Sequence, residues 1–283
     1  MTYYDLSIIS IHGFPKYNLE LMAIPKGVKV YLRFFNYSDI IHLSEQEETK
    51  FELKAGLISA LCNFSNQIDK HIEILEFTTQ SDTKDKEIRT NKGDALITTT
   101  TESYLFHDQV RKKIDLIYSK FIYPKLPLDA SEEISDNEET EIIEILTDGK
   151  AKTHLNLKKE PIEISAHKFL EEMDAYGLKA IIITSMDLSP LTCFSSKTVY
   201  SLRDINEILR NIGNIPDIDP FEWKYRQSFI TNQQCWVFLI NSGIGITVED
   251  LFEPYYYLLV TTPNSYLGEF PARLTAEFND ILT

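Results

Sequence analysis

The chain is poor in the residues that mark metal-binding and secreted proteins. It has 3 cysteines in 283 residues, and Cys62, Cys193 and Cys235 are far apart, with no second Cys or His at metal-ligand spacing. We therefore predict no metal site and expect buried free thiols in a reducing compartment. The N-terminal residues lack the basic start and apolar core of a signal peptide, so we expect a cytoplasmic protein.

Long apolar runs and an excess of basic residues are absent as well. No run approaches the ~20 apolar residues that a membrane-spanning helix needs, which predicts no integral membrane segment. Lys and Arg number 28 against 43 Asp and Glu, a net charge of −15. Affinity for nucleic acid comes largely from basic side chains that neutralise phosphates, so we predict no nucleic-acid partner.

The negative charge is concentrated in one short segment. Residues 1–128 carry 16 basic and 17 acidic side chains, residues 129–148 carry none and 9, and residues 149–283 carry 12 and 17. Low hydrophobicity with high charge is typical of a disordered linker. We therefore predict an acidic linker over residues 129–160, acting as a solvated tether or as a docking segment for a basic surface. Its apolar residues 142–146 are consistent with a short strand or a helix.

The sequence lacks the common signatures of nucleotide-binding and catalytic sites. There is no G-x-x-x-x-G-K-[ST] segment, no H-E-x-x-H and no G-x-S-x-G. Gly243 and Gly245 lack the third glycine of a dinucleotide-binding loop, so we expect a tight turn or bulge there. His12 is the most site-like histidine, but a turn histidine at the end of a strand is the simpler interpretation. We predict no catalytic residue and no cofactor.

The first predicted domain covers residues 1–128. Apolar patterns predict strands over residues 6–11 and 28–35, which would form an opening hairpin, and later strands over 72–77, 87–91 and 94–101. A helical stripe between them comprises Leu53, Leu57, Leu61, Phe64 and Ile68. A last helix would carry Val110 to Phe121 on one face, with Ser103 as its N-cap.

The second predicted domain covers residues 161–283. It would open with a helix that has Pro161 in its first turn, ends at Gly177 and buries Ile164, Phe169, Leu170 and Met173. We then predict strands over 180–184 and 191–195, a helix over 202–212, and strands over 227–230, 235–240, 244–248 and 255–260. A final helix would have Pro271 in its first turn.

The two predicted domains are similar in element order and in one local stretch. Residues 96–105 align without a gap onto residues 258–267. In both stretches an apolar strand continues into Thr-Thr and then into Ser-Tyr-Leu at the start of the last helix. This predicts a duplicated domain, although strand-to-helix junctions share composition by chance.

The segment Gly56-Leu-Ile-Ser-Ala60-Leu resembles the central helix of longin-like domains, in which such a helix lies against a five-stranded sheet. Residues 161–283, with a helix ahead of their hairpin, resemble the related roadblock domains. The turn at 187–190 and the long segment 215–225 depart from that pattern. The resemblance implies an α/β fold of the α+β type, with two longin/roadblock-like domains, each a mostly antiparallel five-stranded sheet packed with helices.

The resemblance also implies a function without chemistry. Longin and roadblock domains dimerise and bind Ras-like small GTPases or other trafficking components, and the chain is similar to archaeal homologues of such regulators. We therefore expect a cytoplasmic, non-enzymatic GTPase regulator or adaptor in vesicle trafficking. It would lie peripheral to membranes through its partner, which would be a small GTPase or another longin/roadblock protein. It could form homo- or hetero-dimers.

Four residues are predicted to contact a partner. Asn63 and Gln67 would lie on the exposed face of the central helix. Tyr256 would point to the opposite face from Tyr255 and Tyr257, because strand side chains alternate, and an outward Tyr could form a binding patch near Trp223 or Tyr225. Phe35 is predicted for the same reason, although core packing would explain both aromatics. The alternatives are a small-ligand sensor or enzyme with a site between the domains, and a structural dimerisation module.

Overall fold

The computed structural model describes residues 2–10, 15–37, 95–126, 134–196, 200–213, 215, 217–230 and 233–283. The chain divides into two compact units, residues 1–37 with 94–283, and residues 38–93. The second unit lies outside the described residues, as do the helix predicted over 53–68 and the strands predicted over 72–77 and 87–91. The first unit is of the mixed α+β class: its described residues form two antiparallel sheets, of 4 and 5 strands, and six α-helices.

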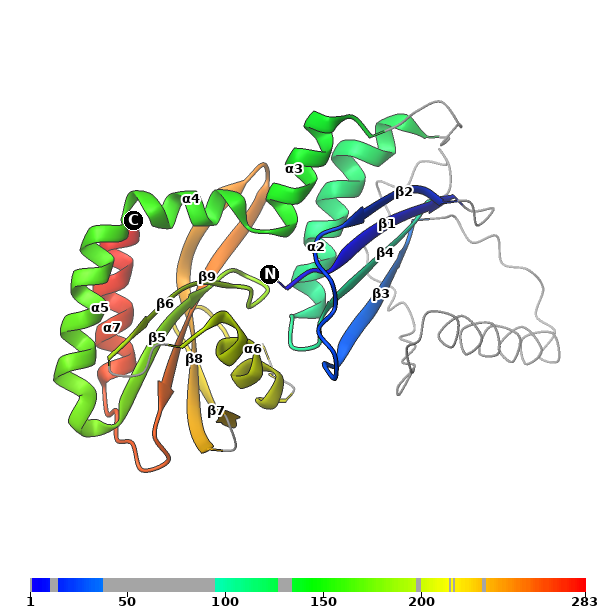
Figure 1. Ribbon diagram of the computed structural model, residues 1–283. Helices are drawn as coiled ribbons and strands as arrows, with labels where there is room; N and C mark the ends of the chain where they lie inside the picture. The colour runs from blue at the N-terminus through cyan, green and yellow to red at the C-terminus, as the bar shows by residue number, and fades with distance from the viewer. Residues whose placement is uncertain are drawn as a thin grey trace, which may run out of the picture. The chain divides into compact units, whose positions relative to one another are not determined.

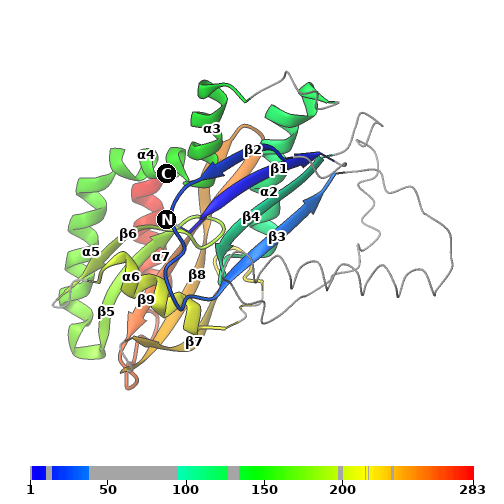
Figure 2. The same ribbon diagram turned by 45° about the vertical axis from the view of Figure 1, so that its right-hand side comes forward.

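The first sheet has the strand order β2-β1-β4-β3, and Figure 2 shows its strands side by side. The strands are β1 (Asp5–Ser10), β2 (Pro15–Glu20), β3 (Val30–Asn36) and β4 (Ala95–Glu102). β4 lies in the middle and is almost entirely buried. One face of the sheet is packed by α2 (His107–Ile117), which buries Val110, Ile114 and Ile117. The strand predictions for β1, β3 and β4 are confirmed.

Two local predictions in this region are wrong. The strands predicted over 6–11 and 28–35 do not pair with each other, because β1 and β3 each pair with β4, and β1 also pairs with the unpredicted β2. β2 was missed because its sequence is polar and only Leu19 is buried. The N-cap of α2 is Phe106 rather than Ser103, since Tyr104 and Leu105 are drawn into the core before the helix begins.

The described part of the predicted linker is helical, in contrast to the disorder predicted for its acidic residues. α3 (Asp136–Leu146) and α4 (Gly149–Leu157) follow one another. Ser135 and Glu138 form a capping box at the start of α3, and acidic residues in a first helical turn are stabilised by the helix dipole. Ile142 and Leu146 are buried on the inner face. The apolar segment 142–146 is therefore helical, and the acidic charge lies mostly on the solvent side.

The second sheet has the order β6-β5-β9-β8-β7 and is visible in Figure 1. Its elements are α5 (Lys159–Met173), β5 (Leu178–Thr184), β6 (Pro190–Ser195), α6 (Leu202–Asn211), β7 (Trp223–Ile230), β8 (Gln233–Val248), β9 (Leu251–Thr261) and α7 (Phe270–Leu282). They follow the predicted succession except that the strands predicted over 235–240 and 244–248 are one continuous strand, β8. Pro271 lies in the first turn of α7 and Gly177 follows the end of the first helix, as predicted. The segment around Gly243 and Gly245 is a bulge between β8 and β9. Ile164 is 64% exposed, so its predicted burial is wrong.

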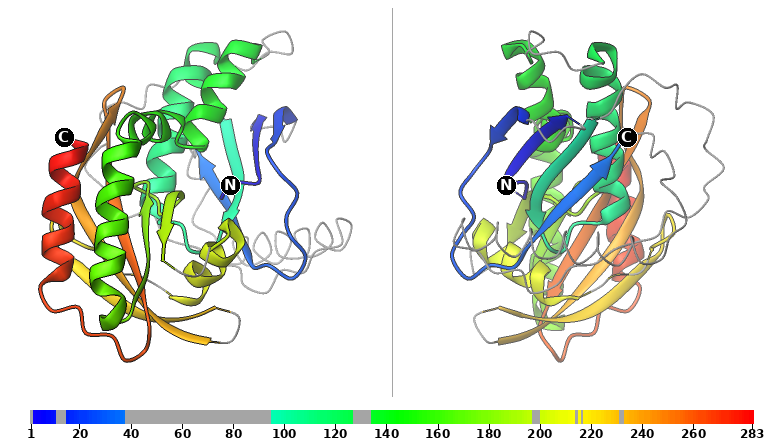
Figure 3. Two further views of the ribbon diagram at one scale, coloured as in Figure 1. Left: turned by 60° about the vertical axis from the view of Figure 1, so that its left-hand side comes forward. Right: turned by 90° about the vertical axis from the view of Figure 1, so that its right-hand side faces the viewer.

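Helices cover both faces of the second sheet. α5 and α7 lie side by side on one face and α6 lies on the other (Figures 1 and 3). The α5/α7 face buries Phe169, Phe270 and Phe278. On the α6 face, one continuous apolar cluster joins Ile205 and Leu209 of α6 to the residues that α2 packs against the first sheet.

The two sheets share their central pairing. In each sheet, the strand that comes first in the chain pairs antiparallel with the strand that comes last. β1 pairs with β4, with Ile9 opposite Leu96, and β5 pairs with β9, with Ile182 opposite Leu258. The gapless alignment of 96–105 with 258–267 therefore matches residues at equivalent places. The sheets differ in strand number, four against five, and in chain order: β3 precedes residues 38–94, whereas β8, which has the corresponding place in its sheet, follows α6.

Candidate functional site

A buried charge cluster joins α2 to two turns. Lys113 has no exposed side-chain surface, and its Nζ lies 2.6 Å from Asp148 Oδ1 and 2.7 Å from Asp187 Oδ2. Asp148 stands between α3 and α4 with a positive φ of 58°, and Asp187 lies in the turn between β5 and β6. The cluster therefore connects three segments that are far from each other in the sequence.

Asp187 accepts several further hydrogen bonds. Tyr3 donates its hydroxyl to Asp187 Oδ2 over 2.7 Å. The Ser185 hydroxyl and the Ser189 backbone N–H both donate to Oδ1, over 2.7 Å and 2.9 Å. A carboxylate held by an ammonium group and three other donors is well compensated for its burial.

Within this cluster the pKa values of Lys113 and Asp148 are raised and that of Asp187 is lowered. Burial opposes the charge on Lys113, but Asp148 and Asp187 more than reverse this and raise its pKa. Burial also opposes the charge on Asp187 and would raise its pKa, yet Lys113 and the hydrogen-bond donors hold this pKa well below the ordinary value. Burial, together with repulsion from Asp187, raises the pKa of Asp148 to about 6 despite the attraction of Lys113. Asp148 is thus the carboxylate of this pair that takes up a proton first.

A third buried carboxylate links the first sheet to α6. Glu102 at the end of β4 is fully buried. Arg210 of α6 donates to it twice, over 2.8 Å from Nε and 2.5 Å from Nη2, and Tyr4 donates its hydroxyl over 2.5 Å. Bidentate pairing of this kind is the geometry in which a guanidinium compensates a buried carboxylate best.

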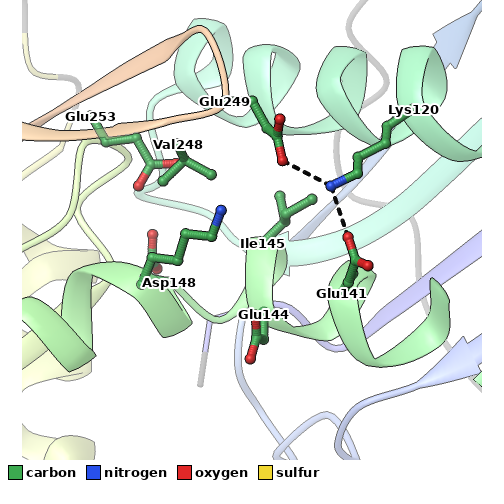
Figure 4. A pocket seen from close by; sticks show the side chains of 9 residues that line it. Lys120, Glu141, Glu144, Ile145, Asp148, Val248, Glu249 and Glu253 are labelled. Carbon is green, nitrogen blue, oxygen red and sulfur yellow. Dashed lines mark hydrogen bonds and ion pairs between the residues drawn. The ribbon is translucent and has the colours of Figure 1, made fainter. Parts of the chain in front are cut away.

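Asp148 also lines a small cavity whose walls carry mostly charged side chains (Figure 4). It has a volume of about 30 Å³, enough for one or two water molecules and far below the size of ligand pockets. Its lining combines acidic with basic side chains: Lys120, Glu141, Glu144, Ile145, Asp148, Lys150, Val248, Glu249 and Glu253. Lys120 bridges Glu141 and Glu249 over 2.7 Å and 2.8 Å.

Glu253 is a second buried carboxylic acid of this cavity, besides Asp148, whose pKa is raised. It is only 4% exposed, and burial raises its pKa to about 7, with the attraction of Lys113 and Lys150 offset by the repulsion of Asp148 and Asp187. Glu253 therefore changes charge near neutral pH. No group of three or more His, Cys, Asp or Glu that could hold a metal ion occurs among the described residues.

The structure buries two of the four predicted partner residues. Phe35 is 3% exposed and stacks on His107, with ring centroids 6.0 Å apart. Tyr256 is 5% exposed and meets Phe106 edge-on at 5.6 Å. The expectation of an outward tyrosine fails because helices cover both faces of this sheet where β9 runs. Asn63 and Gln67 lie outside the described residues.

Exposed aromatic side chains instead run along β7, the edge strand of the second sheet. Trp223, Tyr225 and Phe229 are 42%, 53% and 42% exposed, and they lie on one face of the strand. The partly buried rings of Trp236 and Phe238 on β8 lie beside them, 5.5 Å and 5.7 Å from Tyr225. We call these five side chains the aromatic edge. The sequence analysis named Trp223 and Tyr225 as parts of a binding patch, but it placed them around Tyr256, which is buried.

A second exposed apolar site lies where α4 meets α5. Leu157 and Ile164 are 79% and 64% exposed. They border an open cleft of about 440 Å³, which is also lined by Asn156, Lys159, Glu160 and Glu163. Apolar groups alternate there with charges of both signs, an arrangement that selects no single class of partner.

The sequence did contain a signal for the buried cluster. Lys113 stands at the apolar positions of its helix, between Val110, Ile114 and Ile117, and a charged residue on an apolar stripe indicates a buried ion pair. The partners of Lys113 carried no such signal, because they lie 35 and 74 residues away.

The described cysteines have the surroundings of unreactive thiols. Cys193 and Cys235 are free, and burial raises the pKa of both, to about 11 for Cys193. Since thiolates are the reactive species, both side chains act as small apolar residues at neutral pH. Cys62 lies outside the described residues.

No described helix combines the length and apolarity that crossing a membrane requires. Comparison of the chain with protein-family models yields no match, and a search of curated proteins likewise yields none.

Proposed function

We propose that the protein is a non-enzymatic adaptor or regulator, which binds a Ras-like small GTPase or another trafficking component through longin/roadblock-like domains. The observation that carries this proposal is the aromatic edge. Trp and Tyr are favoured anchors of protein interfaces, and Trp223 and Tyr225 are both more than 40% exposed. They lie on a strand that pairs with a described neighbour on one side only.

The arrangement of the second sheet supports the domain assignment in this proposal. A helix, α5, precedes the β5–β6 hairpin, α6 follows it, and α7 closes the unit after three more strands. This is the element order that we expect of a roadblock-like domain. The first sheet shares the pairing of its first strand with its last. Fold alone does not decide function, so the proposal of a GTPase partner rests on the resemblance to longin and roadblock domains.

The buried charged groups support a structural role for the junction between the sheets. Lys113, Asp148 and Asp187 bind one another, and Glu102 binds Arg210 and Tyr4. Exposed aromatic groups at one edge of a sheet, together with buried charges that are paired within the protein, suit a surface that binds a partner.

The proposal is tested by affinity capture from the native lysate with the full-length chain as bait, in the presence of GDP or of a non-hydrolysable GTP analogue. We expect a small GTPase to be enriched. Trp223→Ala with Tyr225→Ala should abolish this enrichment. Tyr266→Ala, which removes a tyrosine that is 74% exposed on another element, should not.

Absence of any small GTPase from the wild-type capture would contradict the proposed partner. Equal capture by all three baits would exclude the aromatic edge as the contact. Titration calorimetry with the purified GTPase would then decide whether Asn63→Ala and Gln67→Ala weaken binding, as the predicted central-helix face requires.

A further inference from the structure

The backbone of β7 presents alternate peptide groups at the edge of the sheet. The N–H of Asn241 donates to the carbonyl of Glu222 over 3.0 Å, directly before the paired residues of β7 and β8. In an antiparallel pair, residues bonded to the neighbouring strand alternate with residues that point away from it. The even-numbered residues of β7 are therefore bonded to β8, and Trp223, Tyr225, Gln227 and Phe229 direct their N–H and C=O groups outward.

Two side-chain hydrogen bonds confirm this orientation independently. Arg226 Nη1 donates to the carbonyl of Tyr225 over 3.0 Å, and Asn211 Nδ2 donates to the carbonyl of Phe229 over 3.2 Å. Both acceptors are odd-numbered residues of β7. Side chains reach these carbonyls because β8 does not occupy them. A sheet edge of this kind is the template on which a further strand can add, and the added strand would replace these two side-chain bonds with backbone bonds.

The side chains of β7 separate into two chemical faces. Trp223, Tyr225 and Phe229 form the aromatic edge on one face. Lys224 and Arg226 alternate with them and belong to the opposite face. Neither of these two basic residues has an ion-pair partner in the part of the chain that the structure describes.

The charge of this hairpin differs from that of the whole chain. The sequence of β7 and β8, residues 223–248, contains two basic residues and no acidic one, whereas the chain has a net charge of −15. Glu222 immediately precedes the strand. A strand added beside β7 would thus have aromatic neighbours on one face and basic neighbours on the other.

We propose that β7 receives an extended segment of the partner protein in which apolar and acidic residues alternate. The segment would pair with the outward groups of β7 as a sixth strand, the mode of binding known as strand addition. Its apolar side chains would contact the aromatic edge, and its acidic side chains would lie beside Lys224 and Arg226, at the ~5 Å between Cβ atoms of directly opposed residues. The inference rests on the proposed adaptor function and specifies the chemistry that the partner offers.

A second copy of this chain is a poorer occupant of the same edge. Antiparallel pairing of two β7 strands about Arg226 places the two guanidinium groups opposite each other. A shift of one register step places Arg226 opposite Lys224. Like charges in directly opposed positions destabilise a sheet, whereas acidic residues in the same positions stabilise it.

The probe is a fluorescein-labelled, N-acetylated peptide of eight residues with alternating Glu and Val, as long as β7 itself. Fluorescence anisotropy with the full-length protein measures its affinity. A peptide with Lys in place of Glu serves as the charge control. We expect the Glu peptide to bind at least about tenfold more tightly than the Lys peptide. Lys224→Glu with Arg226→Glu should reverse this preference.

Gln227 allows a test of the backbone pairing. Its N–H points outward, so Gln227→Pro removes a donor for the added strand and leaves the bonds to β8 intact. We expect Gln227→Pro to weaken binding of the Glu peptide by about fivefold to tenfold, and Gln227→Ala to leave it unchanged. Thermal unfolding followed by circular dichroism verifies that both variants fold.

Equal affinity for the Glu and Lys peptides would overturn the charge assignment. Unchanged binding by a folded Gln227→Pro variant would overturn strand addition. If the peptide does not bind although a small GTPase is captured from the lysate, this inference fails and the proposed function stands. If the peptide binds as expected and no GTPase is captured, the peptide site stands and the proposed partner is wrong.

Discussion

Lys113 Nζ lies 2.7 Å from Asp187 Oδ2, and neither side chain has any exposed surface. The pair connects α2, which packs on the first sheet, with the β5–β6 turn of the second. Removing charges from water is costly, and this cost is offset only by close pairing and by the additional hydrogen bonds to Asp187. The stability of the whole described unit should therefore depend on each member of the cluster.

Replacing Lys113 with Met should destabilise the protein strongly. The substitution retains an apolar stem of similar length but leaves the carboxylates of Asp148 and Asp187 buried together without their cation. We expect a loss of about 3 to 5 kcal/mol in the free energy of unfolding, measured in urea. Lys112→Met, one residue earlier on the exposed side of the helix, is the matched control and should change it by less than about 0.5 kcal/mol. Similar small losses in both variants would contradict a central role for the cluster.

The two carboxylates of the cluster should differ in the cost of their removal. Asp187 accepts hydrogen bonds from Lys113, Tyr3, Ser185 and the Ser189 backbone, whereas Asp148 accepts a side-chain bond from Lys113. Asp187→Asn should therefore reduce the free energy of unfolding, measured in urea, by about 1 to 3 kcal/mol more than Asp148→Asn does. Asn tolerates the positive φ at position 148, so that variant isolates the effect of charge. The reverse order would mean that Asp148 is the main partner of Lys113.

Glu253 should make stability fall as the pH rises toward neutral. Its pKa in the folded protein is raised from 4.5 to about 7, so the folded state holds the proton more tightly than the unfolded chain does. The penalty for ionising it is absent below pH 4.5, grows as the pH rises, and is complete above pH 7. Glu253→Gln should thus stabilise the protein at pH 8 by at most about 3 kcal/mol and have little effect at pH 4.

Urea unfolding of both proteins between pH 4 and pH 8 measures this difference directly. Glu249→Gln is the control on the rim of the same cavity. Lys120 lowers the pKa of Glu249, so this substitution removes a favourable contact and should produce no gain at pH 8. A stability difference between wild type and Glu253→Gln that does not vary with pH would show that Glu253 is not buried with a raised pKa.

The second sheet was predictable because its signals are local. Pro271 and Gly177 mark helix ends by backbone chemistry, and the apolar runs of β5 and β9 require burial on both faces. The failures arise where tertiary context decides. β2 buries only Leu19 and has no strand pattern of its own, so its pairing with β1 follows from the neighbouring strand rather than from its sequence.

The site was less predictable than the fold for the same physical reason. Composition showed that residues 129–141 were too acidic for a core, but an acidic first turn with a Ser135 cap is also a good helix start, and Ile142 and Leu146 supply an inner face. The burial of Phe35 and Tyr256 depends on Phe106 and His107, which are distant in the sequence. Lys113 alone carried a usable signal, as a charge on an apolar stripe.

The tryptophans of the chain allow the partner site to be observed without a label. The chain has 2 tryptophans, Trp223 and Trp236, and both belong to the aromatic edge. Because Trp223 is 42% exposed, acrylamide should quench the fluorescence of the free protein appreciably. A bound partner that covers the aromatic edge excludes the quencher, so we expect the Stern–Volmer constant to fall by about half or more when a partner buries the ring, as is typical of interface anchors. Trp236→Phe leaves Trp223 as the one tryptophan of the chain. In this variant the partner should reduce quenching by a larger fraction than in the wild type. Unchanged quenching in a complex formed at saturation would place the contact on another surface, for which the predicted helix face around Asn63 and Gln67 would be the next to test.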